Sequence, residues 1–100
     1  MNVNITVRHT DITDQTKEYM EQKVQRLSKY FNNIQSISLI VDEEKFNQIV
    51  EILVNSPVFN IAVKESAENV RAAFDKALHV AEKSIRREKE RIRDAKKNPR

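Results

Sequence analysis

Hydrophobic and polar residues alternate at the start of the chain. On one side of residues 2–8 lie Val3, Ile5 and Val7. A period of two is typical of a strand with one buried face. The segment that follows offers Asp11 or Thr13 to accept a backbone N–H bond at the start of a helix. The pattern therefore predicts a strand followed closely by a helix.

From about residue 13 to 31 the apolar residues recur with helical spacing. They are Met20, Val24, Leu27 and Phe31. Spacings of three and four residues place side chains on one face of an α-helix. Asn32 and Asn33 come next, and asparagine tolerates the left-handed backbone of many helix exits. We expect the helix to end there.

Three alternating segments follow, at residues 34–42, 48–55 and 58–64. The positions predicted to face the core are Ile37, Leu39, Val41, Val50, Ile52, Val54, Phe59, Ile61 and Val63. A polar connection, "DEEKFN", separates the first two segments, and Ser56–Pro57 marks a turn before the third. Short connections between strands favour an antiparallel meander.

The last predicted element is a long helix that starts near Ser66. Ser66 is expected to cap it, with Glu68 or Asn69 in the first turn. Its apolar stripe comprises Val70, Phe74, Ala77 or Leu78, Ala81, Ile85 and Ile92. At about 1.5 Å per residue, thirty residues span about 45 Å, so the end of this helix should project beyond a small sheet.

These elements predict the order β-α-β-β-β-α. The fold class is α+β, a two-layer sandwich whose four-stranded sheet carries both helices on one face. The opposite sheet face presents mainly polar residues and can remain solvated. We expect one domain over residues 1–95, followed by a disordered basic tail at 96–100.

Composition adds limits to this picture. With 100 residues, 39% hydrophobic and 33% charged, the chain suits a single domain with a modest core. It has no cysteine, hence no disulfide framework. No stretch approaches the length of a membrane span, and the N-terminus lacks a signal-peptide pattern. We expect a cytoplasmic protein without a membrane partner.

Residues that could carry catalysis are sparse. There is no glycine at all, so no Gly-rich phosphate loop, and His9 and His79 are far apart without a carboxylate cluster at metal-ligand spacing. The acids of Asp42–Glu44 are most simply a solvated hairpin turn. We therefore predict a protein that is not an enzyme and uses neither cofactor nor metal.

Charge is unevenly distributed along the chain. Residues 71–100 carry eleven basic and five acidic side chains, a net charge of +6, whereas residues 1–70 carry a net charge of −3. Eight Lys or Arg occur within the sixteen residues 82–97. Such asymmetry suggests a partner held by one end of the molecule.

Helical projection groups these cations into rows outside the apolar stripes. On the first helix one row comprises Tyr19, Lys23, Arg26 and Tyr30. On the second helix two neighbouring rows comprise Lys76, Lys83 and Arg87, and His79, Arg86, Arg93 and Lys97. Cations bracketed by tyrosines suit phosphates and a stacked base or ribose, although tyrosines beside a core stripe also commonly extend the core.

Two interpretations of the rows remain open. Acidic residues lie among the cations, so the helix could be a solvated, self-paired surface with pairs such as Glu82–Arg86. Alternatively, if both helices cover one sheet face, the rows form a continuous positive surface for a polyanion. The net charge of +6 favours the polyanion, and nucleic acid held through its backbone is the first candidate.

Several segments together resemble the ribosome hibernation-promoting factor family, also known as the ribosome-associated inhibitor A or sigma-54 modulation family. They are "NITVRHTDIT", "YMEQKVQRLSKYF", "EEK" at 43–45, and "ENVRAAFDKA" with the basic helix that follows. Val7 stands where the family has glycine, and Asn69 and Arg71 replace an Asp and a Tyr. The resemblance covers nearly the whole chain, which looks like the short form without a separate dimerisation domain.

The resemblance implies a double-stranded-RNA-binding-like fold and a specific partner. The protein would bind ribosomal RNA of the small ribosomal subunit, in the channel that holds mRNA and tRNA, and would compete with both. The family's RNA-contacting residues correspond here to Lys23, Arg26, Lys83, Arg87, Lys89 and Arg91. Arg86 and Arg93 join them from helical projection, with Tyr19 and Tyr30 as candidate stacking residues. The free protein is expected to be a monomer.

Two other functions fit the same residues. One is a regulatory module whose charged helix binds an acidic protein. The other is a general binder of structured RNA, although the sequence lacks the glycine- and lysine-rich loop typical of such domains.

Overall fold

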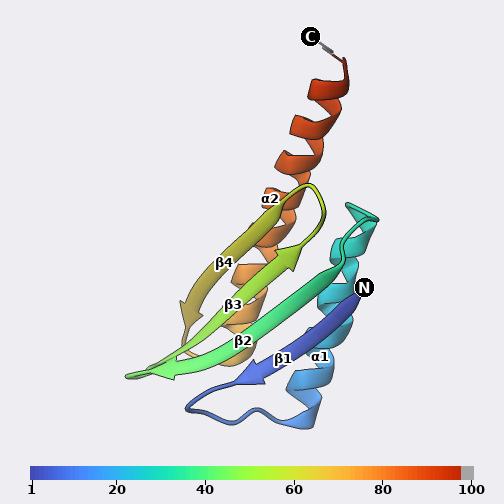
Figure 1. Cartoon of the computed structure of the whole chain (residues 1–100). Helices are drawn as coiled ribbons and strands as arrows, with labels where there is room; N and C mark the ends of the chain where they lie inside the picture. The colour runs from blue at the N-terminus through green and yellow to red at the C-terminus, as the bar shows by residue number, and fades with distance from the viewer. Residues whose placement is uncertain (98–100) are drawn as a thin grey trace.

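The computed structural model describes residues 1–97 and shows two layers (Figure 1). The elements are β1 (Asn2–Val7), α1 (Asp14–Val24), the 3₁₀-helix η1 (Gln25–Lys29), β2 (Ser36–Glu44), β3 (Asn47–Asn55), β4 (Asn60–Ala67) and α2 (Val70–Lys97). Strands lie in the order β1-β2-β3-β4, with β1 parallel to β2 and the other neighbours antiparallel. Both helices cover one face of the sheet, which confirms the predicted fold class.

The core lies between the sheet and the helices, where alternation and helical spacing predicted it. Leu39, Ile52 and Val63 pair across β2, β3 and β4 and point inward together. The stripe of α2 that covers them is buried at Ala73, Phe74, Ala77, Leu78, Ala81 and Ile85. Burying one large apolar side chain stabilises the fold by about 1.5–3 kcal/mol. This shared core holds α1 and α2 in fixed positions on the sheet.

The first helix is shorter than its apolar spacing predicts. Thr13 caps it, because its side-chain oxygen accepts the backbone N–H of Thr16 at 3.1 Å. From Gln25 the chain tightens into η1, so the predicted end at residue 31 was wrong. Phe31 lies beyond the helix and packs on Phe59, with ring centroids 4.9 Å apart. An apolar residue of a loop can thus fill a helical position in the sequence pattern.

The start of α2 also differs from the prediction. Ser66 belongs to β4 and pairs with Ile49 of β3, because the strand ladder continues to Ala67. Asn69 caps the helix instead, and its side-chain oxygen accepts the backbone N–H of Ala72 at 2.8 Å. The predicted cap at Ser66 was therefore wrong.

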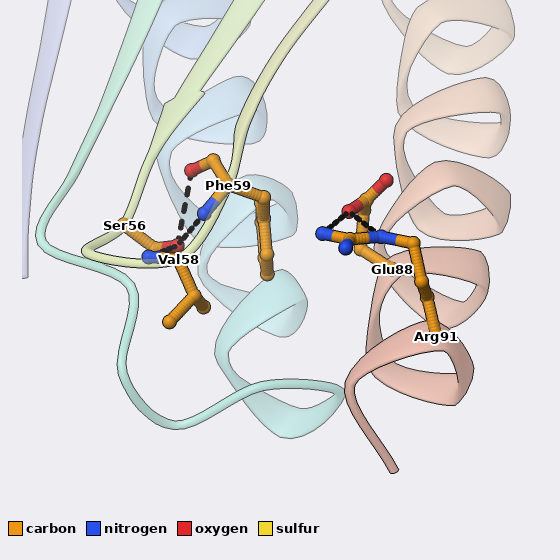
Figure 2. Close-up of polar contacts among 5 residues, drawn as sticks. All are labelled: Ser56, Val58, Phe59, Glu88 and Arg91. Carbon is orange, nitrogen blue, oxygen red and sulfur yellow. Dashed lines mark hydrogen bonds and ion pairs between the residues drawn. The ribbon is translucent and has the colours of Figure 1, made fainter. Parts of the chain in front are cut away.

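The turns use polar side chains and left-handed backbone in place of glycine. The polar connection predicted at 42–47 is mostly paired, which leaves a two-residue loop at Lys45 and Phe46, with Lys45 at φ 58°. Before β4, the buried Ser56 hydroxyl accepts the N–H groups of Val58 and Phe59 and donates to the Phe59 carbonyl (Figure 2). One serine thus closes the turn that precedes β4.

Helix α2 extends past the end of the sheet, as its length predicts (Figure 1). The molecule measures 50 × 23 × 16 Å along its principal axes. The helix continues to Lys97, two residues beyond the predicted domain boundary, and residues 98–100 of the predicted tail lie outside the described residues. No helix within residues 1–97 has the length and apolar character to cross a membrane.

Candidate nucleic-acid interface

Helices α1 and α2 lie side by side and run in the same direction (Figure 1). Two tyrosines join them. The hydroxyl of Tyr19 donates to Asp75 at 2.8 Å, and the hydroxyl of Tyr30, just after η1, accepts from Arg86 at 3.2 Å. Both pairs are separated by 56 residues in sequence. The two helices therefore form one continuous layer.

Tyr19 is half-buried in the seam between the helices. Its ring meets Phe74 edge-on at 5.9 Å, which ties it to the core. The guanidinium of Arg71 lies 4.6 Å from the ring centroid and the ammonium of Lys23 lies 5.1 Å away. The hydrogen bond to Asp75, together with partial burial, raises the pKa of the Tyr19 hydroxyl above its usual 10.0. Tyr19 thus collects two cations at the seam.

Tyr30 holds a third cation. The Arg86 guanidinium lies 4.7 Å from the centroid of the Tyr30 ring while it donates to the hydroxyl. A cation over an aromatic face is attracted by the ring quadrupole. The self-paired interpretation of α2 included a Glu82–Arg86 pair, and in the structure Arg86 contacts Tyr30 instead. Cations of the protein already lie against the rings of Tyr19 and Tyr30. Stacking of a base on either ring stays a prediction.

The predicted RNA-contacting cations lie on the solvent side of the helical layer. Lys23 is half-buried, and the exposed members are Arg26, Lys83, Arg86, Arg87, Lys89, Arg91 and Arg93. Among the side chains that the structure describes, those of residues 1–95, the ion pairs are His9–Asp42 and Glu88–Arg91. Lys83 and Arg87 therefore have no carboxylate partner there. The interpretation of α2 as a fully self-paired helix does not fit this arrangement.

Two further basic residues of α2, besides Arg71 and Arg86, are engaged within the protein. Arg91 donates two hydrogen bonds to one oxygen of Glu88, at 2.9 and 2.6 Å (Figure 2). Lys76 donates to the backbone carbonyl of Ser66 at 2.8 Å, which ties the start of α2 to β4. The row that projection grouped as Lys76, Lys83 and Arg87 is thus divided, and its C-terminal pair remains free among the described residues.

Sequence reasoning did not assign two residues of this seam. From the sequence, Arg71 was noted only as a replacement of a family tyrosine, and Asp75 was only one of the five acidic residues counted in 71–100. Helical spacing places Arg71 and Asp75 on one face of α2, since they are four residues apart. Their contact with Tyr19 depends on how the two helices pack.

The fold and the surface together define a class of protein. It is a small two-layer α+β domain whose helical face presents unpaired cations, which suits a polyanion gripped through its phosphates. Within residues 1–97 no cluster of His, Asp or Glu could hold a metal ion.

Comparison with known proteins places the chain in a family. The family described as "Sigma 54 modulation protein / S30EA ribosomal protein" matches residues 3–93, so the chain belongs to it. A ribosome hibernation promoting factor of Azotobacter vinelandii is 29% identical over 91 residues, covering 91% of this chain and 85% of the relative. A ribosome hibernation promoting factor of Acidithiobacillus ferridurans is 34% identical over 71 residues, covering 66% of this chain and 91% of the relative.

Solved structures share the fold. A ribosomal subunit interface protein from Coxiella burnetii superposes with a TM-score of 0.84 at 23% identity, covering 90% of this chain and 99% of that one. The N-terminal domain of Protein Y from Thermus thermophilus gives a TM-score of 0.78 at 27% identity, covering 87% and 98%. The resemblance that the sequence motifs carried is thereby confirmed at the level of family and fold.

Proposed function

We propose that this protein is a ribosome hibernation factor. It binds the small ribosomal subunit in the channel that holds mRNA and tRNA, and it inhibits translation by steric occlusion. Family membership and the names of the relatives support the association with the ribosome. The observation that carries the proposal is the exposed pair Lys83 and Arg87 on α2, which has no carboxylate partner within residues 1–97.

The physical basis is contact with RNA phosphates. Each phosphate that a Lys or Arg neutralises releases condensed counterions, so such binding weakens as salt rises. Two helical segments supply these cations. The first, formed by α1 and η1, contributes Lys23 and Arg26, and α2 contributes Lys83, Arg86 and Arg87. The projecting half of α2 adds Lys89, Arg91 and Arg93.

Inhibition by steric occlusion does not require a catalysed reaction. A domain that occupies the channel excludes mRNA and tRNA by volume, and its affinity for the subunit sets the strength of inhibition. This agrees with a site built from cations and aromatic rings. The protein acts as a competitor and not as an enzyme.

Co-sedimentation with purified small subunits tests the proposal. The wild type should sediment with the subunit, lose binding as salt rises, and be displaced by tRNA bound beforehand. Lys83→Glu with Arg87→Glu should abolish binding. The matched control is Lys45→Glu with Lys64→Glu, which reverses two exposed lysines of the sheet layer and should bind like the wild type.

Each result has a clear meaning. If the Lys83 and Arg87 reversals sediment like the wild type, the proposed surface is wrong. If the wild type binds no subunit at any salt, the regulatory protein-interaction module becomes the better function. Equal binding to the subunit and to arbitrary RNA duplexes would instead indicate a general binder of structured RNA.

A further inference from the structure

A hollow of about 350 Å³ lies between the end of η1 and the projecting half of α2. Its lining residues are Lys29, Tyr30, Phe31, Asn32 and Lys89. Ligand pockets commonly measure about 300–1,000 Å³, so the volume suits a small group and not an extended chain. Residues 60 positions apart in sequence meet here because the first helix ends beside α2.

The lining has a consistent chemistry. Lys29 and Lys89 line the hollow from two different elements, and neither forms an ion pair within the described residues. No carboxylate lines the hollow. The aromatic side chains of Tyr30 and Phe31 add apolar surface, and the Asn32 amide offers both donors and an acceptor. A ligand that is anionic at one end and flat and polar at the other matches this set.

Two other hollows of similar volume lack this combination. The one between the N-termini of α1 and α2, of about 320 Å³, is lined by Asp11 as well as Arg71. The one on the open sheet face, of about 310 Å³, has no charged side chain in its lining. Of these three hollows, the one beside η1 has positive charge without opposing negative charge.

The aromatic wall is already held in place. The Phe31 ring packs on the buried Phe59 ring with centroids 4.9 Å apart. Tyr30 is fixed from the α2 side by the hydrogen bond and the ring contact with Arg86. A wall that is ordered before binding loses little conformational entropy when a ligand arrives.

We propose that this hollow binds one unpaired nucleotide of the RNA partner. Its phosphate lies between Lys29 and Lys89, its base lies against the aromatic wall, and the Asn32 amide hydrogen-bonds a base edge or a ribose hydroxyl. Bases of an A-form duplex are stacked and inaccessible to such a site, whereas unpaired nucleotides can be splayed into it. The proposal rests on the proposed function and adds Lys29, Phe31 and Asn32 to its contacts.

The test is an amide NMR titration of the ¹⁵N-labelled chain with two RNA probes. One probe is single-stranded pentauridylate, and the other is a self-complementary RNA duplex supplied at the same total concentration of phosphate. We expect pentauridylate to shift the amides of residues 29–32 and of Lys89. Lys29→Gln with Asn32→Ala should weaken pentauridylate binding about tenfold, as expected for the loss of a phosphate contact and a base contact.

The matched control is Lys17→Gln with Asn33→Ala. It removes one exposed lysine and one exposed asparagine outside the hollow and should leave affinity within about twofold, as expected when no contact is lost. Inorganic phosphate serves as a third probe. If phosphate alone shifts these amides as strongly as pentauridylate does, the hollow is an anion site only and the nucleotide proposal fails.

The two proposals fail in different ways. A Lys29 and Asn32 variant that keeps the wild-type melting temperature and binds pentauridylate like the wild type overturns the nucleotide site. Equal shifts from duplex and single strand overturn it as well. Neither result affects co-sedimentation of the wild type with the small subunit, and failure of that co-sedimentation overturns the proposed function alone.

Discussion

Arg86 of α2 donates a hydrogen bond of 3.2 Å to the Tyr30 hydroxyl while its guanidinium lies 4.7 Å from the centroid of the same ring. The two contacts restrain a long side chain that would otherwise sample many rotamers. They also join the end of the first helical segment to the point where α2 leaves the sheet. Tyr30 therefore orients a cation of the proposed RNA surface, in addition to forming part of the aromatic wall of the hollow.

Replacing Tyr30 should weaken binding to the small subunit without unfolding the protein. Tyr30→Phe removes the hydrogen bond and keeps the ring, whereas Tyr30→Leu removes both. A cation–π contact at an exposed site contributes about 0.5–1 kcal/mol, and a hydrogen bond contributes about 0.5–1.5 kcal/mol. We expect Tyr30→Leu to raise the dissociation constant about five- to tenfold and Tyr30→Phe to raise it less.

A double-mutant cycle with Arg86→Ala distinguishes positioning from direct contact. If Tyr30 acts by orienting Arg86, Tyr30→Leu should have little further effect in the Arg86→Ala background. Additive losses would mean that Tyr30 contacts the RNA by itself, which would support stacking at this residue.

The Tyr19–Asp75 hydrogen bond predicts a loss of stability at alkaline pH. Because the pKa of Tyr19 is raised in the folded state, the folded chain holds this proton more tightly than the unfolded chain. The resulting stabilisation is complete below pH 10 and is lost as the pH rises through the higher folded-state pKa. Denaturant unfolding at several pH values should show a steeper alkaline decline for the wild type than for Tyr19→Phe. Parallel curves would contradict the assignment.

The His9–Asp42 contact predicts the opposite pH dependence. His9 Nδ1 lies 2.9 Å from Asp42 Oδ1, and this hydrogen bond, with that from the Glu43 backbone N–H, lowers the pKa of Asp42 below 3.8. Asp42 therefore adds stability above pH 3.8 that is lost as the pH falls through the lower folded-state pKa. Carboxyl NMR should give a midpoint below 3.8, and His9→Ala should raise it. An unchanged midpoint in His9→Ala would exclude His9 as the cause.

Asn69→Ala should destabilise the fold through α2. The Asn69 side chain accepts the Ala72 N–H at 2.8 Å, and loss of an N-cap typically costs about 1 kcal/mol. Chemical denaturation should show a lower midpoint with an unchanged slope. Ser66→Ala is the control, because Ser66 lies in β4 and its side chain makes no capping bond, and it should change stability by less than about 0.5 kcal/mol. If Ser66→Ala destabilised the protein more than Asn69→Ala, the assignment of Asn69 as the cap of α2 would be wrong.

The strands and the core were predictable from sequence because burial leaves a simple period. Leu39 and Ile52 each lie in a run of apolar residues spaced two positions apart, and Phe74 and Ile85 recur at helical spacing, so their inward direction follows from backbone geometry. Element ends were harder to predict. Phe31 fitted a helical pattern although it lies in a loop, and Ser66 resembled a cap although β3 holds it in a strand.

Some features of the candidate site were likewise predictable from sequence, and others depend on how the helices pack. That Lys83 and Arg87 are exposed follows from their positions opposite the apolar stripe. The choice of Tyr30 over Glu82 as the partner of Arg86 depends on where η1 ends relative to α2. The hollow that joins Lys29 to Lys89 depends on the same packing, and no spacing along the chain points to it.

The sequence by itself determined the order of elements, the buried faces and the excess of positive charge at the C-terminal end. These properties arise from local periodicity and composition, which each segment carries alone. Only the tertiary structure decided which cations remain unpaired, which tyrosine holds which arginine and where two lysines face one hollow. The physical reason is that ion pairs, ring contacts and hollows depend on distances of a few Å between segments far apart in sequence, and packing of the common core sets those distances.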